Sequence, residues 1–448
     1  MSKKTRAITD PRAAAAATLV AVLDQKGSLS TLDDTAIAPR DRSFYRALCF
    51  GVCRALPQLE LLAAELVSKG FKRKDLDIQA LLLIGLYQLM YMRVPGHAAV
   101  GETAGAAKLL GKPWATRVLN ACLRRYQREH ETLTQPLEKR AEYRYLHPKW
   151  LVQAIKADWP EQAEAILAAN NTPAPMTLRV NRAHTNREDY QQHLTEAQLA
   201  ATYCKDSADG ITLEHPTDVA SLPDFGEGDV SVQDESAQLT APMLMDSLEK
   251  NEHTPLRILD ACSAPGGKTL HLIECALAAK QPLHITALDS DAHRLERVEE
   301  GIERLRPDES IEIELQCADA SQKDWWDGTP FDAILLDAPC SGTGVIRRHP
   351  DIKQLRTKED ISALAHLQSA LLRNVWSMLK EDGTLLYATC SIMPVENSLQ
   401  IERFLTDTPD ASDITPSVPW GIEVPNGRQR LPEINGSDGF FYSLLRKG

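Results

Sequence analysis

The second half of the chain alternates between short apolar segments and helical segments, and this alternation limits the possible folds more than any other feature. The apolar segments are typical of β-strands, and helical patterns begin near Lys268, Asp291, Lys358 and Val395. Such alternation predicts a doubly wound, mostly parallel sheet, whose ligands bind at the carboxyl ends of the strands. The predicted strands are Arg257–Ala261, His284–Asp289, Ile311–Asp319, Asp332–Asp337 and Thr384–Ala388.

The first of these strands leads into a glycine-containing loop, Asp260 to Thr269, that ends in Gly-Lys-Thr. The phosphate-binding loop of nucleoside triphosphatases has the same ending, but it requires a glycine where this chain has Cys262. The strand that ends at Asp337 adds to the ambiguity, because an acidic strand end can hold the magnesium ion of such an enzyme. The loop alone therefore leaves open a triphosphatase and an enzyme with a different ligand.

Carboxylates stand at four successive strand ends: Asp260, Asp289, Asp319 and Asp337. An acid at the end of the second strand can accept from both hydroxyls of a ribose. Asp319, one strand further on, can accept from an exocyclic amine. Three phosphates would be repelled by so many carboxylates without dedicated metal ligands. A single acid after a strand is usually a helix cap, but four at successive ends favour a nucleoside ligand.

Two cysteines also follow predicted strands, each within a Cys-Ser pair. Cys340 lies in Leu336-Asp-Ala-Pro-Cys-Ser-Gly-Thr-Gly344, and Cys390 lies in Leu386-Tyr-Ala-Thr-Cys-Ser391. A thiolate at this edge can add to an electron-poor double bond, which is covalent catalysis. The position of the two thiols does not distinguish their roles. The remaining cysteines are expected to be structural, namely Cys49, Cys53, Cys122, Cys204, Cys275 and Cys317, whereas Cys262 belongs to the loop.

The first part of the chain differs in both pattern and charge. From Pro11 to about Tyr126 the apolar spacing is helical almost throughout, which predicts an all-α module. Residues 1–145 hold 23 Lys and Arg against 14 Asp and Glu, whereas residues 146–448 hold 27 against 48. Basic residues gather at 69–74 and at Arg117, Arg124, Arg125 and Arg128. This charge suits contact with phosphates, although a solvated helical surface is an equally good interpretation.

The length of 448 residues predicts two or three domains. We divide the chain into 1–145, the all-α module; 146–230, linker helices and a small α+β insert; and 231–448, the strand and helix domain. The apolar run 80–92 is broken by Gln88 and is shorter than the ~20 residues of a membrane span. We therefore expect no membrane association.

Nine cysteines, an odd number, favour a reducing cytoplasm over a disulfide framework. Lys3, Lys4 and Arg6 precede an apolar stretch as in a signal peptide, but no cleavage pattern follows, so we expect an ordinary first helix. The sequence contains no Cys-x-x-Cys and no His-Glu-x-x-His motif. We accordingly expect no metal site.

Four motifs together resemble those of one enzyme family, the RNA 5-methylcytosine methyltransferases that use S-adenosyl-L-methionine. They are Ala261-Cys-Ser-Ala-Pro-Gly-Gly-Lys268, Asp337-Ala-Pro-Cys-Ser-Gly-Thr-Gly344, Thr389-Cys-Ser391 and Asp438-Gly-Phe-Phe441. The basic helical module is similar to the NusB-like RNA-binding domain of the branch that modifies bacterial 16S rRNA. Arg179-Val-Asn181 and Gln233-Asp-Glu-Ser236 also match that branch. Small departures, such as Ser263 where alanine is common, touch no implied catalytic group.

The resemblance implies a Rossmann-like α/β methyltransferase domain with a mostly parallel sheet, an N-terminal all-α NusB-like domain and a small α+β insert. It implies that Cys390 is the nucleophile that attacks carbon 6 of a cytosine, and that Cys340 assists release of the covalent adduct. Asp337 is implied to hold the pyrimidine edge. The implied cofactor-binding residues are Cys262, Ser263, Ala264, Pro265, Gly266, Gly267, Lys268, Asp289 at the ribose, Asp319 at the adenine, and Asp337.

The implied substrate is 16S rRNA in a single-stranded or looped region, because the target base must leave its stack to meet a thiol and a sulfonium. Arg347 and Arg348 are candidates for contacts with flanking phosphates. We expect a cytoplasmic monomer. Two alternatives remain from the residues alone: a triphosphatase with a degenerate loop, which would bind ATP, and an RNA assembly factor that keeps the fold without the chemistry.

Overall fold

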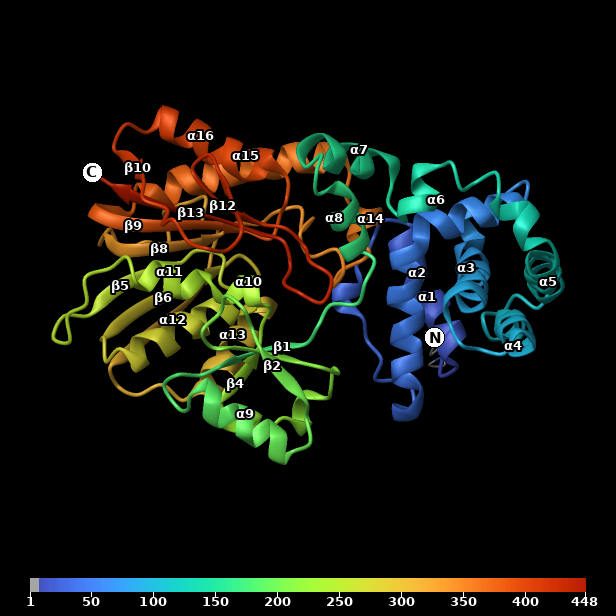
Figure 1. The fold of residues 1–448 in the computed structure, drawn as a ribbon, viewed down its shortest axis with the longest axis horizontal. Coiled ribbons are helices and arrows are strands. Elements are labelled where there is room, and N and C mark those ends of the chain that lie inside the picture. Colours follow the sequence, from blue (N-terminus) through green and yellow to red (C-terminus); the bar gives the residue numbers. More distant parts are fainter. Residues whose placement is uncertain (1–7) are drawn as a thin grey trace, which may run out of the picture. The chain divides into compact units, whose positions relative to one another are not determined.

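A computed structural model describes residues 8–448 and divides them into two compact units (Figure 1). The helical unit contains the chain up to Pro173 together with Ile346–Thr357. The sheet unit contains Ala174–Val345 and Lys358–Gly448. The basic residues Lys3, Lys4 and Arg6 of the supposed signal-like start lie outside the described residues.

Among the residues from 8 onwards, the helical unit contains helices and no strand, as the apolar spacing predicts. Its core consists of small and aliphatic side chains from α1 to α5, including Leu48, Leu82 and Leu123, which are fully buried. Helix α2 is long and apolar enough to cross a membrane, but most of its apolar face packs into this core. The helices are α1 Pro11–Leu23, α2 Pro39–Leu66, α3 Leu76–Tyr91, α4 Gly96–Leu109, α5 Ala115–Thr134, α6 Ala141–Tyr145, α7 Lys149–Asp158, α8 Ala163–Ala169 and α14 Ile352–Leu355.

The segment Ile346–Thr357 is fixed in the helical unit by buried polar contacts. The carboxylate of Asp351 accepts hydrogen bonds from Ser28 Oγ at 2.6 Å and from the peptide N–H of Leu29 at 3.0 Å. The ammonium group of Lys353 donates to three oxygens of the same unit. Arg347 is buried, with only 1% of its surface exposed. The expectation that Arg347 contacts RNA phosphates is therefore wrong.

The large sheet of the second unit has a parallel centre and an antiparallel edge, in the order β11-β12-β13-β9-β8-β5-β6-β7. The five predicted strands form the parallel part, so the mostly parallel α/β prediction is confirmed. Strand β13 pairs antiparallel with β9, β10 and β12. The strands are β5 Leu256–Asp260, β6 Leu283–Asp289, β7 Ile311–Cys317, β8 Phe331–Asp337, β9 Leu379–Thr389, β10 Ala411–Asp413, β11 Ile422–Val424, β12 Gly427–Arg430 and β13 Phe440–Lys447.

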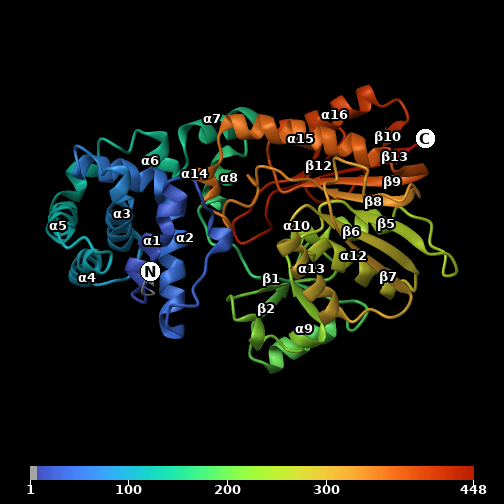
Figure 2. The same ribbon diagram turned by 180° about the vertical axis from the view of Figure 1, so that it is seen from behind.

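Helices cover both faces of this sheet (Figures 1 and 2). Alternate residues of one strand enter different cores, since successive side chains point to opposite faces. Leu386 of β9 packs with α11 and α12, whereas Leu385 and Tyr387 pack with α15 and α16. The helices are α10 Glu235–Gln238, α11 Thr240–Met245, α12 Gly267–Ala278, α13 Ala292–Leu305, α15 Lys358–Trp376 and α16 Ser398–Asp407. The helix expected near Val395 is a 3-10 turn, Pro394–Glu396, followed by α16.

The small α+β insert is a four-stranded antiparallel sheet of order β2-β3-β1-β4 with one helix, α9 Arg187–Glu196. Its strands are β1 Thr177–Val180, β2 Ala201–Tyr203, β3 Gly210–Leu213 and β4 Val230–Val232. The fully buried guanidinium of Arg179 on β1 pairs with both carboxylate oxygens of Glu274 on α12, at 2.9 and 2.7 Å. This pair ties the insert to the large sheet.

Candidate active site

The carboxyl ends of β5, β6, β7, β8 and β9 surround a cavity of about 270 Å³. This volume lies near the lower end of the range of roughly 300–1,000 Å³ typical of small-molecule sites. The lining includes both predicted catalytic thiols and three of the strand-end acids. The predicted residues that line it are Cys262, Ala264, Asp289, Asp319, Asp337, Cys340 and Cys390. The sequence prediction that these residues converge on one sheet edge agrees with this geometry.

The remaining loop residues shape the cavity without lining it: Ser263, Pro265, Gly266, Gly267 and Lys268. Gly266 has φ +101°, and a Cβ there would lie 3.1 Å from the backbone of Val298 on α13. Only glycine combines that backbone conformation with such a close approach. The hydroxyl of Ser263 is buried, and no hydrogen-bond partner is found for it among residues 8–448.

The carboxylate of Asp289 is held at the end of β6 by three donors. Its Oδ2 accepts from the peptide N–H of Ala264 at 3.2 Å, and its Oδ1 accepts from the peptide N–H of Asp291 and from Arg294. A carboxylate has about four lone-pair sites, so acceptor capacity remains for a ligand hydroxyl. Asp319 is exposed, and one of its oxygens accepts from the peptide N–H of Ser321 at 2.8 Å.

Asp260 ends β5 just beneath the loop and is almost completely buried. The hydroxyl of Thr269 donates to its Oδ2 at 2.7 Å. Burial raises the pKa of the Asp260 carboxyl to about 7. Asp260 is therefore a structural support for the loop, and its protonation is linked to folding.

We expect the Asp260→Asn protein to gain stability over the wild type as the pH rises. The unfolded carboxyl loses its proton near pH 4 while the folded one keeps it until about pH 7, so the wild type loses stability across that interval. Asparagine removes this penalty and can still accept from Thr269. The advantage of the variant should be roughly 2–3 kcal/mol larger at pH 8 than at pH 5. Calorimetric melting at both pH values checks this, and a pH-independent difference would contradict it.

Lys268 and Asp337 form an ion pair beside the thiols. Lys268 Nζ donates to Asp337 Oδ2 at 2.5 Å and lies 5.2 Å from the centre of the Phe440 ring. Although burial opposes it, the Asp337 carboxylate raises the pKa of the Lys268 ammonium. The ammonium is thus directed to the acid that ends β8.

The two thiols are close neighbours, with 3.4 Å between the Sγ atoms of Cys340 and Cys390. The hydrogen bond to Cys390, together with burial, raises the pKa of the Cys340 thiol. The loops that carry them are joined at Gly344, whose N–H donates to the carbonyl of Cys390 at 2.9 Å. A Cβ on Gly344 would lie 2.2 Å from the carbonyl oxygen of Gly439 and 2.8 Å from that of Cys390, so only glycine allows this approach.

The charges that line the cavity favour a cationic ligand over a triphosphate. Three carboxylates, those of Asp289, Asp319 and Asp337, face one guanidinium, that of Arg294. This net negative charge attracts a sulfonium and repels phosphates. Among residues 8–448, no group of three or more His, Cys, Asp or Glu side chains is placed to hold a metal ion.

Sequence reasoning missed several residues of the cavity. Arg294, in the first turn of α13, holds both Asp289 and the carbonyl of Ala264, the latter at 2.7 Å. Leu367 and Leu371 line the cavity from α15. Their spacing of four residues marks one face of a helix, but a leucine pair of this kind is far more often core than site.

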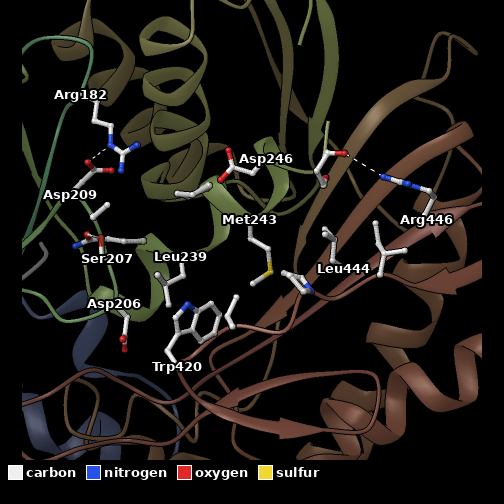
Figure 3. A pocket seen from close by; sticks show the side chains of 17 residues that line it. Arg182, Asp206, Ser207, Asp209, Leu239, Met243, Asp246, Trp420, Leu444 and Arg446 are labelled. Carbon is white, nitrogen blue, oxygen red and sulfur yellow. Dashed lines mark hydrogen bonds and ion pairs between the residues drawn. The ribbon is translucent and has the colours of Figure 1, made fainter. Parts of the chain in front are cut away.

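A second cavity of about 720 Å³ is larger but lacks these groups (Figure 3). Its wall is apolar around Trp420, Met243 and Leu444, and its rim carries Arg182 and Asp209, which form an ion pair. No predicted site residue lines it. We assign the chemistry to the smaller cavity because the thiols and the strand-end acids lie there.

The predicted basic clusters of the helical unit are only partly free for a ligand. Arg73 forms an ion pair with Asp24 at 2.7 Å, and Arg125 and Arg128 both pair with Glu129. Arg117 and Arg124 are exposed. The positive surface is therefore weaker than the residue count suggests.

Three family models match successive parts of the chain. Residues 9–128 match the NusB family, residues 147–220 match the ferredoxin-like domain of RsmF/B-like methyltransferases, and residues 245–446 match the 16S rRNA methyltransferase RsmB/F model.

Relatives match along almost the whole chain. The ribosomal RNA small subunit methyltransferase B of Pseudomonas putida is 50% identical over 98% of both chains, and that of Vibrio vulnificus is 46% identical over 97% of this chain and 99% of its own. Among solved structures, the crystal structure of PH0851 covers 98% of this chain and 99% of its own, with 21% identity and a TM-score of 0.79. A structure of NSun6 from Pyrococcus horikoshii with SFG covers 67% of this chain and 98% of its own, with 22% identity and a TM-score of 0.58. At these identities the two structures show a shared fold.

Proposed function

This chain belongs to the RsmB/F family of 16S rRNA methyltransferases, and from that premise we propose that it methylates carbon 5 of a cytosine through a covalent cysteine adduct. The observation that carries the proposal is the pair of thiols, 3.4 Å apart, in the same cavity as Asp337 and the glycine-rich loop. Methylation of an exocyclic amine or a ribose hydroxyl would need no thiol. Addition of a thiolate to carbon 6 is what makes carbon 5 nucleophilic.

The proposed reaction begins when the Cys390 thiolate forms a bond to carbon 6. The electron pair of the 5,6 double bond then becomes available at carbon 5, which would take the methyl group as the bond from that carbon to the donor sulfur breaks, and the donor sulfur would keep the electron pair of the broken bond. The proton of carbon 5 next passes to Cys340 in its thiolate form, 3.4 Å from the Cys390 sulfur. The electron pair left on carbon 5 restores the double bond, and the bond from sulfur to carbon 6 breaks to return the Cys390 thiolate.

Asp337 and Lys268 act on the pyrimidine edge. The carboxylate of Asp337 accepts from the exocyclic amino group, and the ammonium of Lys268, which donates to that carboxylate, places positive charge near N3 and O2. Negative charge grows on this edge as the thiolate adds, so the Lys268 ammonium stabilises the transition state more than the bound substrate, while Asp337 orients the base and the ammonium.

The cofactor of the proposal is S-adenosyl-L-methionine, which supplies an electrophilic methyl group on a sulfonium. The acid-rich cavity fits that cation, and Asp289 at the end of β6 has acceptor capacity for the ribose hydroxyls. Asp319 lines the same cavity for the adenine amine, and Cys262 and Ala264 line it from the loop. The remaining loop residues, Ser263 and 265–268, bring the start of α12 to the ligand.

The proposed substrate is 16S rRNA in a single-stranded or looped region, modified in the cytoplasm by a monomer. The target base must leave its stack before carbon 6 can meet Cys390. The helical unit, which matches the NusB family, supplies the RNA-positioning surface, and exposed Arg117 and Arg124 are its candidates for phosphate contacts.

The proposal predicts that the purified protein, given S-adenosyl-L-methionine and unmodified 16S rRNA, protects one cytosine from bisulfite conversion. A methyl group on carbon 5 slows bisulfite deamination, so the modified position reads as cytosine while its neighbours read as uracil. Samples without cofactor and with the Cys390→Ala protein serve as controls. Methyl incorporation into rRNA without any protected cytosine would overturn the assignment of carbon 5. No incorporation at all would favour the assembly-factor alternative.

A further inference from the structure

One buried carboxylate, that of Glu396, connects the two loops that carry the thiols. Glu396 is completely buried and lies in the 3-10 turn that precedes α16. We propose that Glu396 is a positioning residue that sets the geometry of Cys340 relative to Cys390. The proposal deepens the proposed function, on which it rests, by assigning a role to a residue outside the cavity lining.

The contacts of Glu396 divide between the two Cys-Ser pairs. Its Oε1 accepts from the peptide N–H of Ser341 at 2.8 Å and from the side-chain amide of Gln368 at 3.1 Å. Its Oε2 accepts from the hydroxyls of Ser341 and Ser391, each at 2.5 Å. Ser341 follows Cys340 directly, and Ser391 follows Cys390 directly. One carboxylate group thus holds the residue that directly follows each of the two cysteines.

The contacts found for this carboxylate come from neutral donors. A buried carboxylate held only by a peptide N–H, an amide and two hydroxyls is a costly arrangement, which a neutral hydrogen-bonded residue would avoid. A carboxylate, however, accepts at both oxygens and offers no donor that could disturb the four contacts. It can therefore hold both loops at once, and this is the property that the geometry uses.

The turn that carries Glu396 is itself fixed. The hydroxyl of Tyr387 on β9 donates to the carbonyl of Glu396 at 2.7 Å, and the Tyr387 side chain is fully buried. The bridge between the Cys-Ser pairs is therefore anchored to the central sheet. Without the bridge the loops stay joined beyond Cys340, by Gly344 to Cys390 at 2.9 Å and by Thr343 to Ser391 and Ile392 at 3.1 Å. Ser341, next to Cys340, reaches the other loop by the longer 3.2 Å contact of its hydroxyl with that of Ser391, so removing the bridge loosens the position of Cys340.

The experiment compares Glu396→Ala and Glu396→Gln with the wild type. Glutamine can keep the bridge, since its oxygen accepts from the Ser341 N–H and its amide donates to the hydroxyl oxygens. Ser391→Ala removes the Cys390 side of the bridge, together with the contacts of that hydroxyl to Ser341, Thr343 and the N–H of Met393. Glu235→Ala and Glu235→Gln are matched controls, because Glu235 is another buried carboxylate that accepts two peptide N–H groups, from Asp206 and Ser207.

The first measurement needs neither RNA nor cofactor. Diamide takes two hydrogens and two electrons from two thiols and joins them as a disulfide. The fraction of protein with a Cys340–Cys390 disulfide after a fixed time, determined by mass spectrometry of peptides, reports how the sulfurs lie relative to each other. We expect at least about a fivefold slower cross-link in Glu396→Ala and Ser391→Ala, and less than a twofold change in Glu396→Gln and the Glu235 variants.

The second measurement is steady-state methylation. Misplacement of reacting groups typically lowers the rate of an enzyme about 10- to 100-fold. We therefore expect kcat of Glu396→Ala to fall by about that factor, while KM for the cofactor changes less than about threefold. Glu396→Gln should restore most of the rate. Equal cross-linking in the wild type, Glu396→Ala and Ser391→Ala would overturn the proposal. It would also be overturned if the Glu235 variants lost as much cross-linking and activity as Glu396→Ala. Because the cross-link does not depend on methyl transfer, failure of the proposed function would be seen separately, in the Cys390 variant.

Discussion

Replacement of Cys390 by alanine is expected to abolish methyl transfer, lowering kcat by roughly 10³-fold or more while S-adenosyl-L-methionine still binds. Without the sulfur, no bond to carbon 6 forms, and carbon 5 of an aromatic cytosine is too weak a nucleophile to take the methyl group. The cofactor-binding candidates lie at the ends of β5, β6, β7 and β8, and none of them contacts the Cys390 side chain in the hydrogen bonds of the site. Methyl transfer to rRNA and calorimetric titration with the cofactor give the two readouts.

Cys317→Ala is the matched control for this substitution. Cys317 also ends a strand of the large sheet, but its side chain is exposed and does not line the cavity. The Cys317→Ala protein should methylate rRNA at the wild-type rate. Full turnover by the Cys390→Ala protein would exclude the covalent mechanism, whereas loss of cofactor binding would show that the substitution disturbs the loop and not the chemistry alone.

The parallel part of the fold could be predicted because its inner strands, such as β6 and β8, are apolar and buried on both faces, while β7 at the edge alternates apolar and polar residues. Ile258, Leu259, Ile285 and Leu288 are fully buried, and a run of such residues followed by a helical pattern has one common interpretation. The convergence of Cys340 and Cys390 followed from the same topology, because β8 and β9 are adjacent and parallel. Here local pattern and global fold agree.

The antiparallel edge could not be predicted because its strand β12 is polar and yet buried. Arg428 and Arg430 are each only 6% exposed. Arg428 donates to the carbonyls of Val418 and Trp420, and Arg430 pairs with Asp206 of the insert. These partners satisfy the buried charges. A sequence pattern records polarity but not the partner that makes burial possible.

The same limit explains why the burial of Arg347 and the contacts of Glu396 could not be predicted from the sequence. Arg347 reads as a surface charge, yet it is buried, and its carbonyl accepts from Arg54, which is 293 positions away in the chain. Glu396 reads as an ordinary helix-start acid, yet it holds Ser341, 55 positions away. Both assignments depend on contacts that loop closure creates, so no local spacing could indicate them.

Replacement of Cys340 by alanine is expected to trap the protein on its RNA. The bond from Cys390 to carbon 6 would still form and the methyl group would still be transferred, but release would be slow without the second thiol at 3.4 Å. A denaturing gel with labelled 16S rRNA should show at least about tenfold more covalent protein–RNA complex than the wild type, as expected when proton transfer at a reacting centre is lost.

The double variant Cys340→Ala, Cys390→Ala is the control that identifies the bonded sulfur, and it should show no complex. This comparison carries more weight than either single variant, because the two thiols share one cavity and their positions do not distinguish nucleophile from release group. If the roles were exchanged, Cys390→Ala would accumulate the complex and Cys340→Ala would form none. A Cys340→Ala protein that turns over normally without a complex would show that release does not depend on Cys340.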